Sequence, residues 1–307
     1  MSGLGDLRFA KPSLPLRLAS WVVSKGKPIF PERIEDVERF LHSRRQPRRA
    51  ETPDKFARRF QVETSEIEGQ ECITLHPSTG PGERHILYFH GGGFVVSAVK
   101  QHWDVIAALV ENTGASVTAA FYNVVPEHPY RDAERMADTL FASAAENREP
   151  ATITLAGDSA GAHIALSLAL RLRDKGGPQA GNLVLFSPWL DVTLKDEAAK
   201  AIEPHDIMLK VGPIRELGRI WADDRDPLSP QCSPLYADLT DLPPTAIFIG
   251  HHDVFLPDCR TFAGRMKQAG RHVELYEYAG APHVFMALAA TREAKDVFSL
   301  VARFVDR

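Results

Sequence analysis

Short apolar runs alternate with longer helical stretches along most of this chain, from about residue 61 onward. The short runs are rich in β-branched and aromatic residues and end at glycine or polar clusters, a pattern typical of buried strands. We expect strands at 86–89, 116–122, 153–156, 183–186, 245–249 and 273–278. The last of these strands could lie at an edge of the sheet and support a homodimer.

The stretches between these strands predict helices. They cover 131–145, 163–173, 258–268 and 292–304. The second of them is apolar nearly all round and is followed by Gly176 and Gly177, which predicts a buried helix that ends at that pair. Alternation of strands and helices favours an α/β fold with a mostly parallel sheet and helices on both faces.

Two segments depart from this alternation. Residues 1 to about 50 are basic and helix-prone, and residues 192–235 carry helical patterning without a strand. We therefore expect one domain over 1–307, with these two segments packed together as a cap over one end of the sheet. The apolar stretch 14–23 is interrupted by Arg17 and is too short to span a bilayer, which predicts an amphipathic helix on the body of the protein.

Composition limits the classes of partner. The chain has 307 residues, 44% hydrophobic, and a formal net charge of −4, so nothing favours a nucleic-acid partner. Its three cysteines are too few and too far apart for a disulfide framework or a zinc site, and we expect buried free thiols. No run reaches transmembrane length, and a cytoplasmic location fits best.

The sequence Gly157-Asp158-Ser159-Ala160-Gly161 matches G-x-S-x-G between a predicted strand and a predicted helix. In this context the serine stands on a sharp turn, and side chains two residues away on either side would clash. The start of the following helix brings a positive dipole end and free N–H groups toward the serine. We therefore predict that Ser159 is a nucleophile, whereas the motif alone would indicate only a glycine-rich turn.

A second glycine cluster, His90-Gly91-Gly92-Gly93-Phe94, follows the first predicted strand of the alternation. Three glycines allow the backbone to approach a ligand closely with its N–H groups exposed, and such donors can hold an oxyanion. A phosphate-binding loop would need Lys-Ser/Thr after the glycines, where this chain has Phe94-Val95.

Together these motifs resemble the hormone-sensitive-lipase-like esterases of the α/β-hydrolase superfamily. The resemblance covers about 70–307 and rests on HGGGF, GDSAG, PEHPY, SPWLD, GHHD and GAPHVF. It implies an oxyanion hole formed by the amides of Gly92, Gly93 and Ala160, a cap, and a preference for short acyl chains. The residues before PEHPY, at 123–125, are Asn-Val-Val, where the family more often has arginine-leucine; this difference leaves the catalytic residues unaffected.

The remaining candidates are a base and an acid. His283 lies in a turn after the last predicted strand, where its imidazole can reach the nucleophile and exchange protons near neutral pH. In this fold the acid precedes the histidine, and Asp253 follows the predicted strand 245–249. Asp258 is the alternative acid, although its place at the start of a helix is also explained by a capping or helix-dipole role.

These residues predict a serine carboxylesterase that acts on a small-molecule ester through an acyl-enzyme. The same residues also suit an amidase, a lactonase or a deacetylase, and a non-catalytic ligand-binding member of the fold is a weaker alternative. We expect neither a metal nor a cofactor, because no cluster of ligands has metal spacing and no G-x-G-x-x-G follows a strand.

Overall fold

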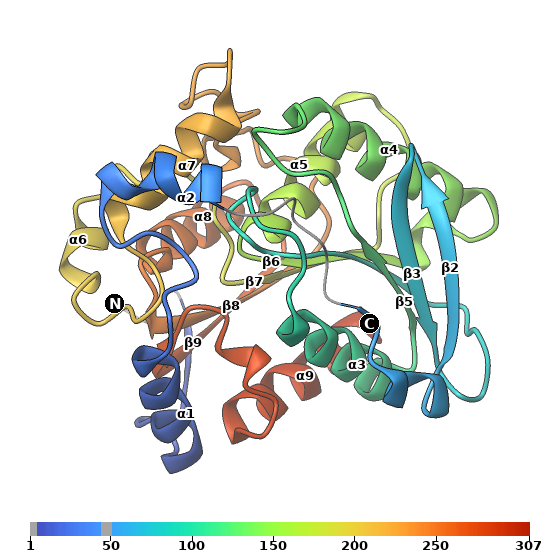
Figure 1. The fold of residues 1–307 in the computed structure, drawn as a ribbon. Coiled ribbons are helices and arrows are strands. Elements are labelled where there is room, and N and C mark those ends of the chain that lie inside the picture. Colours follow the sequence, from blue (N-terminus) through green and yellow to red (C-terminus); the bar gives the residue numbers. More distant parts are fainter. Residues whose placement is uncertain (1–4, 44–50) are drawn as a thin grey trace.

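The computed structural model describes residues 5–43 and 51–307, and its central feature is a nine-stranded sheet (Figure 1). The order across the sheet is β1-β9-β8-β7-β6-β4-β5-β3-β2. The strands are β1 Asp6–Arg8, β2 Gln61–Ile67, β3 Gln70–His76, β4 His85–Phe89, β5 Ser116–Ala120, β6 Ile153–Asp158, β7 Asn182–Phe186, β8 Thr245–His252 and β9 Val273–Pro282. Neighbouring strands run parallel except in the β2/β3 and β3/β5 pairs.

Helices cover both faces of the sheet (Figure 1). The helices are α1 Leu14–Lys25, α2 Val37–Ser43, α3 Lys100–Thr113, α4 Tyr130–Glu146, α5 Ala160–Asp174, α6 Ala198–Ile202, α7 Val211–Ala222, α8 Leu256–Gln268 and α9 Arg292–Val305. Short 3₁₀ turns occupy η1 Ile34–Asp36, η2 Asp54–Arg58, η3 Pro150–Thr152, η4 Pro234–Tyr236 and η5 Phe285–Ala287. The buried faces of α4, α5 and α8 form one apolar core and those of α3 and α9 form the other.

The strand β4 illustrates how the sequence divides the two cores. Successive side chains of a strand point to opposite faces. Leu87 and Phe89 belong to the core under α4, α5 and α8, whereas Ile86 and Tyr88 belong to the core under α3 and α9. Because both faces are covered, the strand is an uninterrupted apolar run and not an alternating one.

The predicted α/β class, the six predicted strands and the four predicted helices are confirmed, with small differences at their ends. Four elements were not predicted: β1, β2, β3 and α3. The strand β2 is solvent-exposed along nearly all of its length, so it lacks the apolar pattern on which a prediction depends. It joins β3 through Glu68 and Gly69, both at positive φ, in a tight antiparallel hairpin.

The N-terminal segment does more than the sequence predicts. Its strand β1 adds in parallel to β9, so β9 has neighbours on both sides and the prediction of 273–278 as an edge strand is wrong. Ser13 caps α1 and also donates to a carboxylate oxygen of Glu293 in α9 at 2.7 Å, and Leu16 is buried in the core on that face. The periodicity of α1 did predict a helix, and the helix lies against the body of the protein.

The later part of this segment reaches residues 192–235, because α2 packs against α7 (Figure 1). Between β7 and β8 the chain forms α6, α7 and η4, and no strand occurs in that stretch, all of which the structure describes. Residues 1–4 and 44–50 of the predicted cap lie outside the described residues. That the two segments act as a cap remains a prediction.

Two further features concern the whole described chain. The thiols of Cys72, Cys232 and Cys259 are free and buried, as the sequence predicted. Across residues 5–43 and 51–307, every helix is too short or too polar to cross a membrane.

The order of the strands defines where a ligand can bind. Strand β4 lies between β5 and β6, so the chain leaves β4 in one direction and later returns to its other side. In open α/β sheets such a reversal leaves a crevice at the carboxyl ends of the strands, where ligands bind. The carboxyl ends of β4 and β6 carry the HGGGF and GDSAG sequences, so both motifs meet at this crevice.

Candidate active site

Ser159 stands at the turn from β6 into α5. Its φ of 53° and ψ of −119° are unfavourable for a residue with a side chain, and its backbone N–H donates to the carbonyl of Phe186 at 2.9 Å. A serine in such a strained turn between strand and helix has its hydroxyl presented at the edge of the sheet. The predicted position of Ser159 between a strand and a helix is confirmed.

The two glycines of the motif are required for steric reasons. A Cβ on Gly157 would lie 2.5 Å from the backbone of Gly161. A Cβ on Gly161 would overlap the backbone of Phe89 and His90 at the end of β4. These contacts bring the start of α5 close to the glycine loop that follows β4, so the two motifs form one unit.

Asp158 joins the glycine loop to the serine turn. Its Oδ1 accepts hydrogen bonds from the Gly91 N–H, at 2.9 Å, and from the Tyr88 hydroxyl, while its Oδ2 lies 3.4 Å from Nε2 of His102. Burial raises the pKa of this carboxyl, but the His102 charge and these hydrogen bonds outweigh it, and the net pKa is lowered. Asp158 is therefore a buried anion that fixes the loop beside Ser159.

Three backbone amides predicted for the oxyanion hole lie close to this unit. Gly92 and Gly93 have φ of 125° and 61°, values that a residue with a side chain rarely adopts. Gly92 also lines the same cavity as Ser159. Ala160 is the first residue of α5, so its N–H has no partner within the helix.

His283 and Asp253 form a buried pair. Nδ1 of His283 lies 2.8 Å from Oδ2 of Asp253, and the two residues are 3% and 0% exposed. Asp253 also accepts the Phe255 N–H at its other oxygen, at 3.0 Å, which orients the carboxylate. The Phe255 ring contacts the imidazole edge-on, with ring centroids 5.2 Å apart.

Charge decides the protonation of His283. Burial lowers its pKa, but the charge and the hydrogen bond of Asp253, together with the charges of Asp206 and Asp158, outweigh burial and raise it above 6.5. The next residue, Val284, donates its N–H to the Ser187 hydroxyl at 3.0 Å, which anchors the loop that carries the imidazole. The imidazole is thus held by contacts on two sides.

The alternative acid, Asp258, does not bond to His283. It lies in the first turn of α8, the position that the helix-dipole alternative predicted, but the N-cap residue is Phe255 and no side chain caps this helix, so the capping alternative is wrong. Asp258 is 3% exposed, and among the described residues its Oδ2 has no hydrogen-bond partner. Burial, with a smaller effect of Asp191, raises the pKa of this carboxyl to about 8.

A cavity of about 340 Å³ joins these groups. Ser159, His283, Asp158, His102 and Gly92 all line it. The rest of its wall is mainly apolar and comes from four parts of the chain: Val23, Gly26, Lys27, Ile29 and Phe30; Val96, Ser97, Val99 and Gln101; Ile207 and Met208; and Pro282, Val284, Ala287 and Leu288. The cavity therefore combines the predicted nucleophile and the predicted base with a mainly apolar surface.

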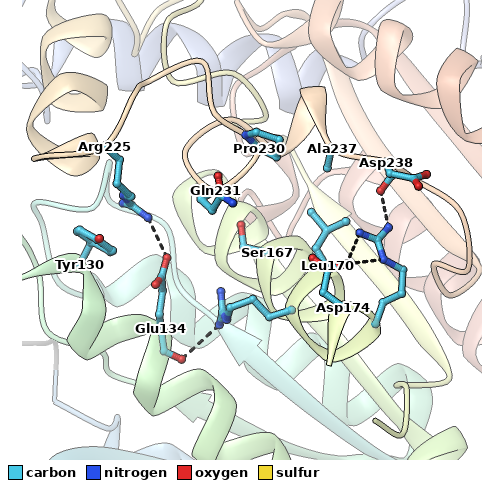
Figure 2. Close-up of a pocket in the computed structure, with 12 residues that line it drawn as sticks. Tyr130, Glu134, Ser167, Leu170, Asp174, Arg225, Pro230, Gln231, Ala237 and Asp238 are labelled. Carbon is cyan, nitrogen blue, oxygen red and sulfur yellow. Dashed lines mark hydrogen bonds and ion pairs between the residues drawn. The ribbon is translucent and has the colours of Figure 1, made fainter. Parts of the chain in front are cut away.

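A second cavity, also of about 340 Å³, lies between α4, α5 and the segment 225–238 (Figure 2). Figure 2 shows Arg225 pointing toward Glu134, and these two side chains form an ion pair with an N–O distance of 3.0 Å. Arg173 forms an ion pair with Asp174 at 2.6 Å. None of the predicted site residues lines this cavity. Five of its charged side chains, those of Glu134, Arg171, Arg173, Asp174 and Arg225, are used in ion pairs, so the cavity at Ser159 is the better candidate for chemistry.

Two other histidines, His163 and His272, have structural positions that do not suit a general base. His163 is fully buried, its Nδ1 lies 3.0 Å from the Trp189 carbonyl, and burial lowers its pKa to about 3. His272 is exposed just before β9. In the described parts of the chain, no group of three or more His, Cys, Asp or Glu side chains could hold a metal ion.

Sequence reasoning missed three residues at the site: Asp158, His102 and Asp206. Asp158 stands beside the serine within the motif, which was a signal that could have been used. His102 and Asp206 come from segments without a motif and are brought to the site only by the fold.

Comparison with known proteins identifies the family of the chain. The model of the alpha/beta hydrolase fold family matches residues 86–287. A protein named "Esterase" from Acinetobacter venetianus is 32% identical over 222 residues, which cover 71% of this chain and 73% of that protein. A protein named "Acetyl-hydrolase" from Streptomyces hygroscopicus is 32% identical over 66% of this chain and 68% of its own length.

A solved structure extends the likeness to nearly the whole chain. An esterase from the bacterial hormone-sensitive lipase family superimposes with a TM-score of 0.81 and 25% sequence identity. The superposition covers 97% of this chain and 98% of that one.

Proposed function

This chain belongs to the alpha/beta hydrolase fold family and resembles its hormone-sensitive-lipase-like esterases, and we propose that it is a serine carboxylesterase that uses Ser159, His283 and Asp253. The observation that carries the proposal is the convergence of a strained serine and a buried Asp–His pair on one cavity. A ligand-binding protein would gain nothing from a strained serine turn, because the strain costs on the order of 1–3 kcal/mol.

The reaction begins with the transfer of the serine proton. Asp253 accepts the N–H of His283 at Nδ1, which leaves Nε2 free to take the proton of the Ser159 hydroxyl. The serine oxygen then bonds to the ester carbonyl carbon, and the carbonyl oxygen becomes an oxyanion. The oxyanion then collapses, the bond to the alcohol oxygen breaks, and the imidazolium gives its proton to the departing alcohol, which leaves an acyl-serine. A water molecule activated by His283 attacks this acyl-serine through a second oxyanion, which releases the carboxylic acid and restores the Ser159 hydroxyl.

Backbone N–H groups stabilise the oxyanion. We assign this role to the amides of Gly92, Gly93 and Ala160. Support comes from the positive φ of both glycines, from the place of Ala160 at the start of α5, and from Asp158, which fixes the loop beside the serine. Preorganised donors of this kind are each worth on the order of 3 kcal/mol in the transition state.

The size of the cavity supports a preference for short acyl chains. A volume of about 340 Å³ lies near the lower end of the range of roughly 300–1,000 Å³ found for small-molecule sites. Ile29, Phe30, Ile207 and Met208 form part of its wall and come from the two segments that we propose act as a cap. Esters with acyl groups of about four to six carbons should turn over faster than those of twelve to sixteen carbons.

The direct test replaces Ser159 with alanine and assays a soluble short-chain p-nitrophenyl ester. We expect a loss of about 10⁶-fold in kcat. Ser167→Ala is a matched control, because Ser167 lies in α5, the helix that follows Ser159, is 8% exposed and has no hydrogen-bond partner for its hydroxyl among the described residues. Retained turnover in Ser159→Ala would exclude the serine mechanism.

The same assay separates esters from related substrates. Matched p-nitrophenyl esters, p-nitroanilides and lactones present the same nucleophile with different leaving groups. An esterase should hydrolyse the ester at least 100-fold faster than the anilide. Faster hydrolysis of anilides or lactones would replace the proposed substrate class and leave the assigned residues in place.

A further inference from the structure

A carboxylate that no motif predicts lies beside the candidate acid. Asp206 belongs to the segment between α6 and α7 and is 2% exposed. Its Oδ1 accepts the N–H groups of Met208 and Leu209, both at 2.9 Å. Its Oδ2 accepts the N–H of Val254 at 3.1 Å. Both oxygens are therefore engaged, and their partners come from parts of the chain more than forty residues apart.

The bond to Val254 reaches the turn that carries the candidate acid. Within this turn the Phe255 N–H donates to the Asp253 side chain at 3.0 Å, and the Leu256 N–H donates to the Asp253 carbonyl at 3.0 Å. The Val254 N–H points instead to Asp206. The turn is thus held from within by Asp253 and from outside by Asp206.

The other oxygen of Asp206 fixes part of the cavity wall. Ile207 and Met208 line the cavity together with Ser159 and His283. Because the Met208 and Leu209 amides bond to the same carboxylate, the backbone under these side chains is tied to the acid turn. A movement of either segment would therefore be transmitted to the other.

Asp206 is also close enough to the Asp–His pair to affect its charge. Its negative charge is one of the influences that raise the pKa of His283, after Asp253. In return, burial and the charge of Asp253 raise the pKa of Asp206 to about 6, although the charge of His283 and the bonds from Met208 and Leu209 lower it.

Other polar groups near Asp206 do not neutralise its carboxylate. Lys210 Nζ donates to the backbone carbonyls of Glu203 and Asp206, at 3.3 Å each. The Glu203 carboxylate accepts the Val211 N–H at 2.5 Å. The neighbouring His205 stacks on His252, with ring centroids 5.2 Å apart.

We propose that Asp206 is a positioning residue that ties the 207–209 wall of the cavity to the acid turn and holds Asp253 in register with His283. The proposal rests on the proposed function, because it assigns roles to Asp253 and His283. Asp206 does not line the cavity and makes no hydrogen bond to the imidazole, so its effect on the reaction passes through the acid turn and through its charge.

The test is Asp206→Asn, assayed on a short-chain p-nitrophenyl ester from pH 5 to 9. Asparagine keeps an oxygen that can accept the Met208 and Leu209 amides, but it lacks the charge. We expect kcat to fall roughly 10- to 100-fold, the scale of a small misplacement of a catalytic group. We also expect the acidic limb of kcat/KM to move to lower pH by roughly half a unit to one unit, because a charge that favours the imidazolium is lost.

A structural role alone would not move the acidic limb. Asp258→Asn is the matched control, since Asp258 is equally buried, lies in the helix that follows the acid turn, and makes no bond to that turn. Asp258→Asn should leave the pH midpoint of the acidic limb of kcat/KM unchanged. Should Asp206→Asn fail to fold, Asp206→Ser offers a short uncharged acceptor with the same expected shift.

An unmoved limb in a folded Asp206 variant would overturn the proposal, whether or not kcat falls. A shift of the same size in Asp258→Asn would also overturn it. Loss of turnover in Ser159→Ala, measured alongside, establishes the proposed function separately. Failure of the Asp206 proposal therefore remains distinguishable from failure of the serine mechanism.

Discussion

The two buried aspartates that follow β8, Asp253 and Asp258, should respond differently to substitution by asparagine: the first in activity and the second in stability. Asp253→Asn removes a charge that lies 2.8 Å from Nδ1 of His283, at a position with no solvent exposure. A unit charge about 4 Å from the imidazolium, at an effective dielectric constant of about 20, is worth roughly 4 kcal/mol, or about 10³-fold in rate. An asparagine amide can also favour the wrong imidazole tautomer, so we expect kcat to fall by 10³- to about 10⁴-fold.

Asp258→Asn should leave kcat within about threefold of the wild type, because Asp258 makes no bond to His283. Its effect should appear in stability. The carboxyl has a pKa of about 8 in the folded protein and about 3.8 when unfolded, so the folded state binds the proton more tightly. The wild type therefore loses stability as pH rises between these values, by at most roughly 1.4 kcal/mol per pH unit. The neutral asparagine removes this slope.

Both variants should be assayed with a soluble short-chain ester at several pH values and unfolded in urea at pH 5 and pH 8. The expected result is a severe kinetic defect for Asp253→Asn alone. We also expect Asp258→Asn to gain stability relative to the wild type between pH 5 and pH 8. A severe kinetic defect in Asp258→Asn, with Asp253→Asn near wild type, would show that the acid is assigned to the wrong residue.

Three further outcomes follow from the site. The raised pKa of His283 places the acidic limb of kcat/KM above pH 6.5, because the base acts only when neutral; a pH profile with its midpoint below 6 would contradict this. Gly161→Ala forces a methyl group against the Phe89 backbone and should abolish activity or soluble folded protein, as circular dichroism and turnover will show; near-normal kinetics would contradict the packing. Ile29 is 45% exposed and lies on the cavity wall, so Ile29→Ala should raise the rate on eight-carbon esters, relative to short-chain esters, several-fold without changing thermal stability. An unchanged chain-length profile would oppose a capping role.

The parts of the fold that the sequence predicts are those whose cause is local. Strand β6 and helix α5 are strongly apolar, and the glycines between them are required by contacts with Phe89 and with each other, so the serine turn could be identified from the sequence alone. His283 and Asp253 could be proposed because each follows a recognisable strand. Their 2.8 Å contact depends on β8 and β9 lying side by side.

The parts that could not be predicted depend on long-range pairing. Strand β1 is three residues long and gains its place only from β9, and β2 is exposed along nearly all its length. The same reason explains Asp206, whose role exists only because its loop folds back onto Val254. The position of Asp258 at the start of a helix predicted a capping or helix-dipole role. Its raised pKa instead follows from its burial, and burial cannot be read from one residue in a sequence.

The most direct test of the central claim is covalent labelling of the wild-type protein with an organophosphate, followed by peptide mapping with mass spectrometry. Such a reagent reports an activated serine hydroxyl independently of the choice of ester. The account predicts one phosphoryl group per chain, located on Ser159, with activity lost in proportion to labelling. Labelling of a different serine, or full activity in a protein labelled at Ser159, would contradict it.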